Sequence, residues 1–588
     1  MREGNTIRRW AQLNTMALAS LLLLAGLARS EDWPMWRHDA GRSSATSEQL
    51  PAGLSLQWSR QLVEPRMAWP EDPRIHFDAT VEPVYAGGLV FVPSSTTDSV
   101  TALDAVSGSV RWKFFADGPV RFAPVIAHGQ VYFGADDGFI YCLAAATGKM
   151  QWRQAARPSN RQAIGSERVI SVWPVRGGPV LAAGKIYFTA GVWPFEGVLL
   201  YDFAVAPNQQ QPPVFRSRAL NSLTPEGYAV ASAGRLYLPC GRALAACFDL
   251  KTGQSVKLSY DSRGKTDYHV TAVGEFIFHG DRIYQVAEKR LLQTAVHRPV
   301  TGPEGVAGTL NNDLVGLNVK KPALVEVVDR KGKTQKVHVL PLSWRMKRAD
   351  LAKIVGASSS DWKIHLQAGS RLYGHMGKQV FAIEPTGTDE TAKVSWHVEI
   401  DSPARTMIAG DGRLIVVSES SKLYCFAAGD AQVRNHPLGK KPLAKAAPTG
   451  RWAELAKQIV TDNSDLQAYC LVPGIGSGKL IDQLLQRTEL HLLVIDSSAE
   501  KVAALRRRCD AAGLYGQRLV ARVGNVDTAQ LPAYYANVIV SEVPMQGDVG
   551  VLYRSLRPYG GNAYLVNSDA AQISRIVEAG GLSKAKLK

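Results

Sequence analysis

A pattern of short strands recurs through residues 80–430 and constrains the fold more than any other feature of this chain. Each copy starts with a glycine and a β-branched or aromatic strand, turns into a second alternating strand, and ends in Thr-Gly or Ser-Gly before a strand with tryptophan. Clear copies begin at Gly88 and Gly129, and the last begins at Gly412. If the widest gap holds two repeats, the 324 residues from Gly88 to Gly412 divide into seven intervals of about 46 residues.

This repeat length predicts a β-propeller. A unit of this size forms about four short strands and cannot bury both faces of its sheet alone, so neighbouring sheets must stack. Radial closure of the stack protects most strand edges. We expect seven or eight blades over residues 31–430. The early strand LSLQWSRQL, which contains Trp58, resembles the outer strand of a repeat without its beginning and is expected to complete the last blade.

Composition excludes some classes of protein. Of the 588 residues, 46% are apolar and 20% are charged, which argues against wholesale disorder and against a polytopic membrane protein. The net charge is +16, and residues 320–363 hold eleven basic against four acidic residues. Because aromatic residues are sparse there and no nucleic-acid motif accompanies the charge, we expect a solvated basic insertion and no nucleic-acid partner. A polyanion-binding surface is the alternative.

The first thirty residues have the pattern of a cleavable signal peptide. Arg2, Arg8 and Arg9 precede an almost wholly apolar run over residues 16–27, and Ala28-Arg29-Ser30 offers small residues at a cleavage site. Twelve residues are too short to span a bilayer as a helix, which needs about 20. We therefore expect a periplasmic or extracellular protein with no transmembrane segment in the mature chain.

The repeats resemble a known family. ALDAVSGSVRW, CLAAATGKMQW and CFDLKTGQSV are similar to the pyrroloquinoline-quinone-type repeat of quinoprotein alcohol dehydrogenases and of the outer-membrane assembly propeller, which binds no cofactor. The resemblance covers residues 32–430. In the dehydrogenases the quinone lies beneath a disulfide of adjacent cysteines, beside Ca²⁺ and a catalytic Asp. None of the six cysteines here is adjacent to another, and no acidic group maps to the metal site, so the resemblance implies the fold but neither quinone nor metal.

The composition changes at about residue 431. Residues 431–452 are rich in proline and lysine and are expected to form a linker. Beyond it the apolar period changes from two to about 3.6, and strands alternate with helices. Residues 453–588 therefore predict a parallel α/β, Rossmann-like domain.

A glycine turn marks the candidate site of this domain. Gly474, Gly476 and Gly478 lie between a buried strand and a helix, where the lack of Cβ lets the backbone approach a ligand. Asp496 ends the next strand, where its carboxylate can accept both ribose hydroxyl hydrogens. The order of these elements predicts an adenosine ligand. A glycine turn needed only for packing is the alternative.

This region resembles class I S-adenosylmethionine-dependent methyltransferases. The resemblance implies that residues 468–478 form the loop at the methionine end and that Asp496 binds the ribose. Asn525 and Asp527 lie where adenine is contacted, although the family commonly has an acid at the position of Asn525. Ser541 and Glu542 end the fourth strand and face the methyl donor. NAD is the alternative ligand.

Methyl transfer needs mainly positioning of a nucleophile, so Glu542 is the candidate catalytic residue, orienting a substrate donor. A structural or ribose-side role for Glu542 is equally compatible with the pattern. The pattern stops after the fifth strand and the helix at residues 569–580, without the family's sixth and seventh strands, so we expect a truncated domain.

The leading hypothesis is an S-adenosylmethionine-dependent methyltransferase carried on an exported propeller that binds a protein or small-molecule partner. Because S-adenosylmethionine is a cytoplasmic metabolite, export and catalysis are in tension. The alternatives are a non-enzymatic exported scaffold with a degenerate nucleotide-binding domain and, third, a quinone-dependent dehydrogenase. The whole arrangement resembles exported multidomain proteins of planctomycete-type bacteria.

Overall fold

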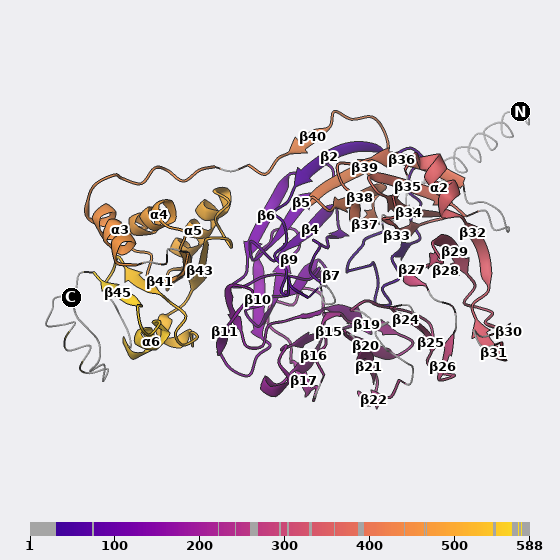
Figure 1. Cartoon of the computed structure of the whole chain (residues 1–588), viewed down its shortest axis with the longest axis horizontal. Helices are drawn as coiled ribbons and strands as arrows, with labels where there is room; N and C mark the ends of the chain where they lie inside the picture. The colour runs from indigo at the N-terminus through magenta and orange to yellow at the C-terminus, as the bar shows by residue number, and fades with distance from the viewer. Residues whose placement is uncertain are drawn as a thin grey trace, which may run out of the picture.

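Eight sheets, each with four antiparallel strands, form a propeller in the described part of the chain, and two of these sheets carry a fifth, parallel strand (Figure 1). The computed structural model describes residues 31–72, 76–221, 223–241, 243–258, 268–280, 282–292, 294, 296–302, 305–328, 332–357, 359–385, 393–439, 441–463, 465, 467–544, 549–566, 574 and 578. The predicted signal peptide lies outside these residues, as does most of the helix expected at 569–580. The propeller prediction is confirmed, with the larger of the two expected blade counts.

The first four blades follow the chain from residue 84. Their middle strands are buried on both faces because neighbouring blades cover them, whereas the outer strands are partly exposed. Blades 1 and 2 consist of β3 (Val84–Ala86), β4 (Leu89–Ser94), β5 (Ser99–Asp104), β6 (Val110–Phe115), and β7 (Val125–Ala127), β8 (Gln130–Gly134), β9 (Phe139–Ala144), β10 (Met150–Ala155). Blades 3 and 4 consist of β14 (Val180–Ala182), β15 (Lys185–Ala190), β16 (Leu199–Ala204), β17 (Arg216–Ala219), and β19 (Val230–Ser232), β20 (Arg235–Cys240), β21 (Ala243–Asp249), β22 (Ser255–Val256).

The other four blades complete the ring. Blades 5 and 6 consist of β23 (Val270–Val273), β24 (Phe276–His279), β25 (Arg282–Gln285), β26 (Arg290–Leu292), and β27 (His297–Gly302), β28 (Gly305–Leu310), β29 (Asp313–Leu317), β32 (Leu342–Met346). Blades 7 and 8 consist of β33 (Trp362–Ala368), β34 (Arg371–Met376), β35 (Gln379–Glu384), β36 (Lys393–Glu399), and β37 (Ala404–Gly410), β38 (Arg413–Ser418), β39 (Lys422–Ala427), β2 (Ser55–Gln61).

Strand β2 closes the ring, as the sequence predicts. It pairs antiparallel with β39, with Trp58 opposite Cys425, so an early segment supplies the outer strand of the last blade. The other edge of β2 pairs in parallel with β40 (Arg434–His436), which lies in the predicted linker. An edge strand accepts a further strand because its N–H and C=O groups are otherwise unpaired. The first part of the linker is therefore held on blade 8.

Tryptophans of outer strands join neighbouring blades. The indole N–H of Trp112 in blade 1 donates to the carbonyl of Ala145 in blade 2 at 2.9 Å, and Trp58 of blade 8 bonds Ala105 of blade 1 in the same way. Each ring lies over a turn glycine. Gly148 has a φ of 69°, and a Cβ there would lie 2.5 Å from the ring of Trp112. The Thr-Gly turns therefore serve packing between blades.

Residues 33–46, here called the axial segment, run along the inner strands of the propeller. The backbone of this segment bonds six blades, at Tyr85, Ile126, Ala231, Ala272, Thr301 and Gln367. Its last residues form β1 (Ala45–Thr46), which is parallel to β33. Arg42 is fully buried, and its guanidinium donates to three backbone carbonyls at 2.7–2.9 Å. Burial lowers the pKa of Arg42 to about 9.

Short insertions decorate the blades. They comprise the pairs β11 (Gln162–Gly165) with β12 (Arg168–Ser171), β13 (Gly177–Gly178) with β18 (Gly227–Tyr228), and β30 (Ala323–Val328) with β31 (Thr334–Val339), the 3₁₀ helix η2 (Pro194–Glu196), and α2 (Arg348–Val355). The basic stretch at residues 320–363 contains the β30–β31 hairpin, which is inserted between β29 and β32 of blade 6, and α2, which connects blade 6 to blade 7.

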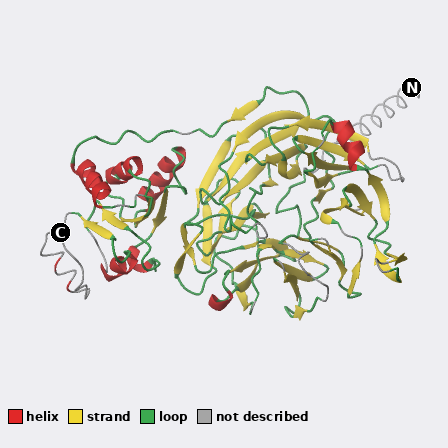
Figure 2. Ribbon diagram, viewed as in Figure 1, coloured by secondary structure: helices red, strands yellow, loops and turns green. Residues whose placement is uncertain are grey.

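Most of the helices belong to a separate α/β unit (Figure 2). Its parallel sheet has the order β43-β42-β41-β44-β45. The elements are α3 (Arg451–Asp462), β41 (Tyr469–Pro473), α4 (Lys479–Arg487), β42 (His491–Asp496), α5 (Ala499–Ala511), β43 (Leu519–Val523), η3 (Val526–Thr528), β44 (Val538–Ser541), α6 (Val549–Ser555) and β45 (Asn562–Leu565). Helices α3, α4 and α5 pack on one face of the sheet, and α6 with η3 on the other. Among the described helices, none combines the length and apolar character needed to cross a bilayer.

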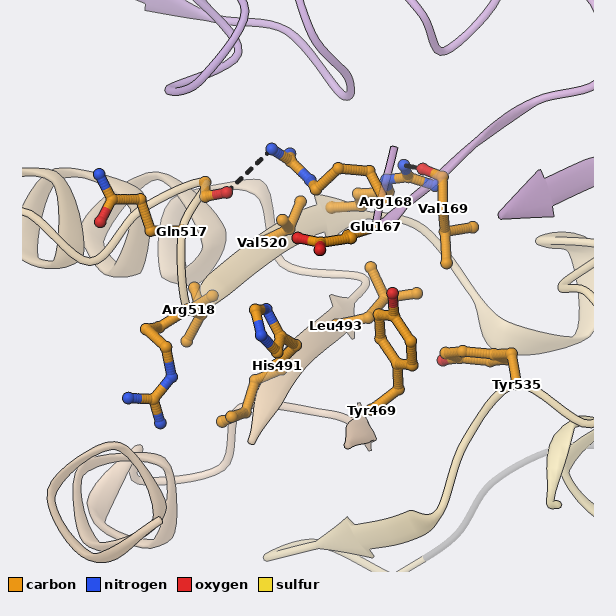
Figure 3. Close-up of a pocket in the computed structure, with 14 residues that line it drawn as sticks. Glu167, Arg168, Val169, Tyr469, His491, Leu493, Gln517, Arg518, Val520 and Tyr535 are labelled. Carbon is orange, nitrogen blue, oxygen red and sulfur yellow. Dashed lines mark hydrogen bonds between the residues drawn. The ribbon is translucent and has the colours of Figure 1, made fainter. Parts of the chain in front are cut away.

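The α/β unit is bound to blades 1 and 2. The guanidinium of Arg506 in α5 lies 2.5 Å from the carboxylate of Asp117, and both side chains are largely buried. Arg168 of β12 donates to the carbonyl of Gly516 at 3.0 Å. A crevice of about 30 Å³ lies at this contact. Figure 3 shows Arg168 on the propeller side of it and Tyr469 and His491 on the other. That volume holds about two water-sized groups, so the contact is closely packed.

Candidate functional sites

The glycine turn after β41 lies beside the carboxylate of Asp496. Gly474, Gly476 and Gly478 have φ values of 95°, 58° and 77°, which favour glycine. The Oδ2 atom of Asp496 accepts the N–H of Ile475 at 2.7 Å, and Oδ1 accepts the N–H of Ser498 at 2.8 Å. Asp496 thus points toward the bend, and both of its oxygens have backbone partners.

Glu542 fills the inside of this bend. Its carboxylate accepts the N–H and the hydroxyl of Ser477, each at 2.6 Å, and the N–H of Leu480 at 2.5 Å. Only 6% of Glu542 is exposed. A Cβ at Gly476 would lie 2.6 Å from the Cβ of Glu542 and 2.7 Å from its Oε2. The carboxylate therefore occupies the amino end of α4, where an anionic ligand group would otherwise be stabilised.

The other predicted residues make local contacts. The hydroxyl of Ser541 donates to the carbonyl of Pro473 at 2.6 Å and joins the ends of β44 and β41. The side-chain oxygen of Asn525 accepts the N–H of Asp527 at 3.0 Å and caps η3. The N–H of Gly524 donates to the carbonyl of Asp496 at 3.1 Å, so this turn adjoins the glycine bend. The structure thus brings the predicted residues to one edge of the sheet.

The bend does not fit a nucleoside-bearing sulfonium as it is folded. Space next to Gly476 is taken by Glu542, and the oxygens of Asp496 bond backbone N–H groups instead of ribose hydroxyls. These carboxylates satisfy the chain's own donors. Binding of S-adenosylmethionine by these residues stays a prediction.

A larger cavity lies inside the propeller. It has a volume of about 530 Å³ and is lined by the axial segment, by residues between 67 and 83, and by blades 7 and 8. Aromatic side chains, including Trp36, face polar ones such as Lys363, His365 and Glu82. Its volume is within the range of small-molecule sites, about 300–1,000 Å³.

Burial favours neutral groups in this cavity. His375 is 3% exposed, its Nδ1 lies 2.8 Å from the Nε2 of His365, and burial lowers its pKa to about 4. Glu82 accepts the hydroxyl of Thr406 at 2.8 Å, and burial raises its pKa. Both shifts are toward the uncharged form, because a low-dielectric site disfavours charge. The lining therefore combines hydrogen-bonding groups with charged side chains.

The sequence did not predict this cavity, because its lining residues are scattered from Trp33 to Glu419. A local signal exists only in His365 and His375, which the β33–β34 hairpin brings together. Among the residues that the structure describes, no group of three His, Cys, Asp or Glu side chains is arranged to hold a metal ion.

Comparison with known proteins identifies the repeat type. Residues 34–187 match the family described as "Outer membrane protein assembly factor BamB". The chain is 26% identical to the dehydrogenase subunit of a quinone alcohol dehydrogenase from Gluconobacter oxydans, over 25% of this chain and 20% of that protein. It is also 26% identical to a polyvinylalcohol dehydrogenase of a Pseudomonas species, over 26% of this chain and 34% of that protein. The chain thus spans about a third or less of the length of these relatives.

Solved structures of the same repeat type are more distant. The quinohemoprotein alcohol dehydrogenase from Comamonas testosteroni is 16% identical, with a TM-score of 0.43 over 74% of this chain and 86% of that one. BamB from Moraxella catarrhalis is 12% identical, with a TM-score of 0.29 over 65% and 99%. Similarity this low carries no argument about activity. The sequence matches and the eight sheets together identify a pyrroloquinoline-quinone-type repeat propeller.

Proposed function

We propose that the protein is an exported binding platform whose propeller takes a small, neutral, polar ligand in its central cavity. The observation that carries the proposal is the cavity of about 530 Å³ lined by the axial segment and several blades. A site with aromatic walls and a few convergent polar groups is the usual form of a ligand pocket.

The charges of the lining support a neutral ligand. Three cationic side chains face three acidic ones, namely Arg37, Lys363 and Arg405 against Glu82, Asp361 and Glu419. Two of them, Arg405 and Glu419, lie 2.8 Å apart and neutralise each other. His375, whose pKa burial lowers to about 4, adds a neutral imidazole. A ligand with several hydroxyl groups and an apolar ring face, such as a sugar, fits this lining.

The test is a thermal-shift screen of neutral mono- and oligosaccharides on the full chain, followed by calorimetric titration of those that stabilise it. We expect Lys363→Ala to weaken binding at least tenfold. Lys378→Ala is the matched control, since Lys378 is exposed on the same blade and does not line the cavity. Stabilisation by no sugar, or equal affinity in both variants, would overturn the proposal.

Methyl transfer by the α/β unit is the second candidate. The direction of the Asp496 carboxylate and the parallel sheet order favour it, whereas the position of Glu542 opposes it. Titration of the full chain with S-adenosylmethionine and with its demethylated product tests this candidate. Binding that Asp496→Ala abolishes supports it, and no binding of either compound removes it, leaving the α/β unit as part of a scaffold.

Quinone-dependent oxidation remains the least supported candidate, because the chain has no adjacent cysteines. Titration with pyrroloquinoline quinone and Ca²⁺, followed by absorption, tests it. A quinone band that appears on the protein would support this candidate over the first.

A further inference from the structure

A second cavity lies where the propeller meets the α/β unit. It has a volume of about 170 Å³ and is lined by blade 2 and by the ends of β42 and β43, at Ile495 and Val523. This volume exceeds by about tenfold the 10–15 Å³ that a single water-sized probe needs. The cavity therefore has room for a group of several heavy atoms, and both units contribute to its wall.

Among the described residues, two arginines in this wall, Arg157 and Arg522, have only neutral hydrogen-bond partners. The Nη1 atom of Arg157 donates to the backbone carbonyl of Asp137 at 2.7 Å. The Nη1 atom of Arg522 donates to the side-chain oxygen of Gln162 at 2.7 Å, and its Nη2 donates to the carbonyl of Val169. The Nε atoms of both arginines are buried without a hydrogen-bond partner among the described residues.

The two guanidinium groups also repel each other. Burial lowers the pKa of Arg157; the carboxylate of Asp137 opposes the lowering, and the positive charge of Arg522 adds to it. Arg157 lies over the ring of Phe139 at 4.3 Å, which stabilises a cation but does not neutralise it. Two like charges at one cavity are stabilised best by an anion between them.

Among the described residues, neither acid in the wall forms an ion pair with Arg157 or Arg522. Asp117 is bound to Arg506 at 2.5 Å and to Arg153 at 2.7 Å. Asp137 accepts the hydroxyl of Tyr141 and the N–H of Phe139, and burial together with the nearby Asp117 raises its pKa. Asp117 is therefore engaged by other arginines, whereas Asp137, whose charge acts on Arg157, is hydrogen-bonded to Tyr141 and Phe139.

We propose that this cavity binds a phosphate group, held by Arg157 of blade 2 and Arg522 of β43. The planar guanidinium matches the oxygens of phosphate, and hydrogen bonds between charged partners are about twice as strong as neutral ones. The side chains of Asn160 and Asn525 also line the cavity. The bound anion bridges the two units and tightens their contact. The site is separate from the central cavity and does not depend on a ligand there.

The test is calorimetric titration of the full chain in phosphate-free buffer with inorganic phosphate and, separately, with glycerol phosphate. Binding of either anion is expected, and the pair distinguishes a free phosphate from a phosphate ester. We expect Arg157→Gln and Arg522→Gln each to weaken binding at least tenfold. Arg161→Gln is the matched control, because Arg161 is exposed and paired with Glu196 at 2.8 Å.

A second measurement guards against loss of structure, because Arg522 also contacts the propeller. Arg157→Lys keeps the positive charge but loses the planar guanidinium with its several N–H donors, so this variant is expected to bind phosphate more weakly than the wild type. Phosphate is further expected to raise the unfolding temperature of the wild type but not of Arg157→Gln. Binding of neither anion by the wild type, or binding by Arg157→Gln equal to that of the wild type, would overturn the proposal.

Discussion

The carboxylate of Glu542 holds the glycine bend closed, and its replacement by glutamine tests this directly. The two carboxylate oxygens accept three donors, from Ser477 and Leu480, at 2.5–2.6 Å. A carboxamide has one acceptor oxygen, and its NH₂ group is a donor. In Glu542→Gln, at least one N–H therefore loses its acceptor whichever way the amide is turned.

The size of the effect follows from these bonds. A hydrogen bond to a charged group contributes about 1.5–3 kcal/mol, and a buried donor left without an acceptor costs a similar amount. We expect the free energy of opening the bend to fall by about 2–3 kcal/mol. Because 1.4 kcal/mol is a factor of ten, the affected amides of Ser477 or Leu480 should exchange about 30–150-fold faster. Hydrogen–deuterium exchange on the peptide over residues 474–482 measures this.

Glu454→Gln is the control. Glu454 lies on α3 in the same unit, is 61% exposed and pairs only with Lys457 among the described residues, so its replacement should leave exchange in the bend unchanged. Equal exchange in Glu542→Gln and in the wild type would refute the closing role of the carboxylate.

Three further predictions concern the propeller. Gly148→Ala should lower the free energy of unfolding by about 2–4 kcal/mol in denaturant titration, because the new Cβ would clash with Trp112 at a positive φ. Gly129 has a similar φ but open space around it, so Gly129→Ala should lower the free energy of unfolding by only about 1–2 kcal/mol. Equal losses in the two variants would contradict the packing role of Gly148. Arg42→Met should lower stability by about 3–5 kcal/mol because three buried carbonyls lose their donor, and an unchanged melting temperature contradicts this. Burial raises the pKa of Glu226 from 4.5 to about 7, so the folded state binds the proton more tightly and this stabilisation is lost as pH rises from about 4.5 through 7. The melting temperature of Glu226→Gln relative to wild type should therefore rise between pH 5 and 8, and parallel pH profiles would contradict the shift.

The propeller could be predicted from local sequence patterns because each repeat contains, within a short stretch, the residues that form its turn and pack between blades. The turn glycine and the following tryptophan lie close in the sequence, so Gly148 with Trp152 could be recognised as a unit before any contact was known, although the ring that covers Gly148 is that of Trp112 in the preceding blade. The sequence also predicted that the strand containing Trp58 completes the last blade, and the pairing of this strand with β39 confirms the prediction.

Long-range contacts were not predictable in this way. Glu542 is 66 residues from Gly476, and the pattern of strand ends says nothing about which side chain enters the bend. The lining of the central cavity comes from segments that are hundreds of residues apart, and each contributes only a few side chains. Residues 434–436 have the composition of a linker, yet the free edge of β2 recruits them as a strand.

The inner hydrogen bonds of the axial segment link blades that are distant along the chain. Cutting the backbone within residues 33–46 would release contacts to six blades at once. Open repeat arrays lose their units one after another, because each repeat touches only its neighbours. This ring should instead unfold cooperatively, and protease resistance of one short stretch would report on the integrity of the whole circle.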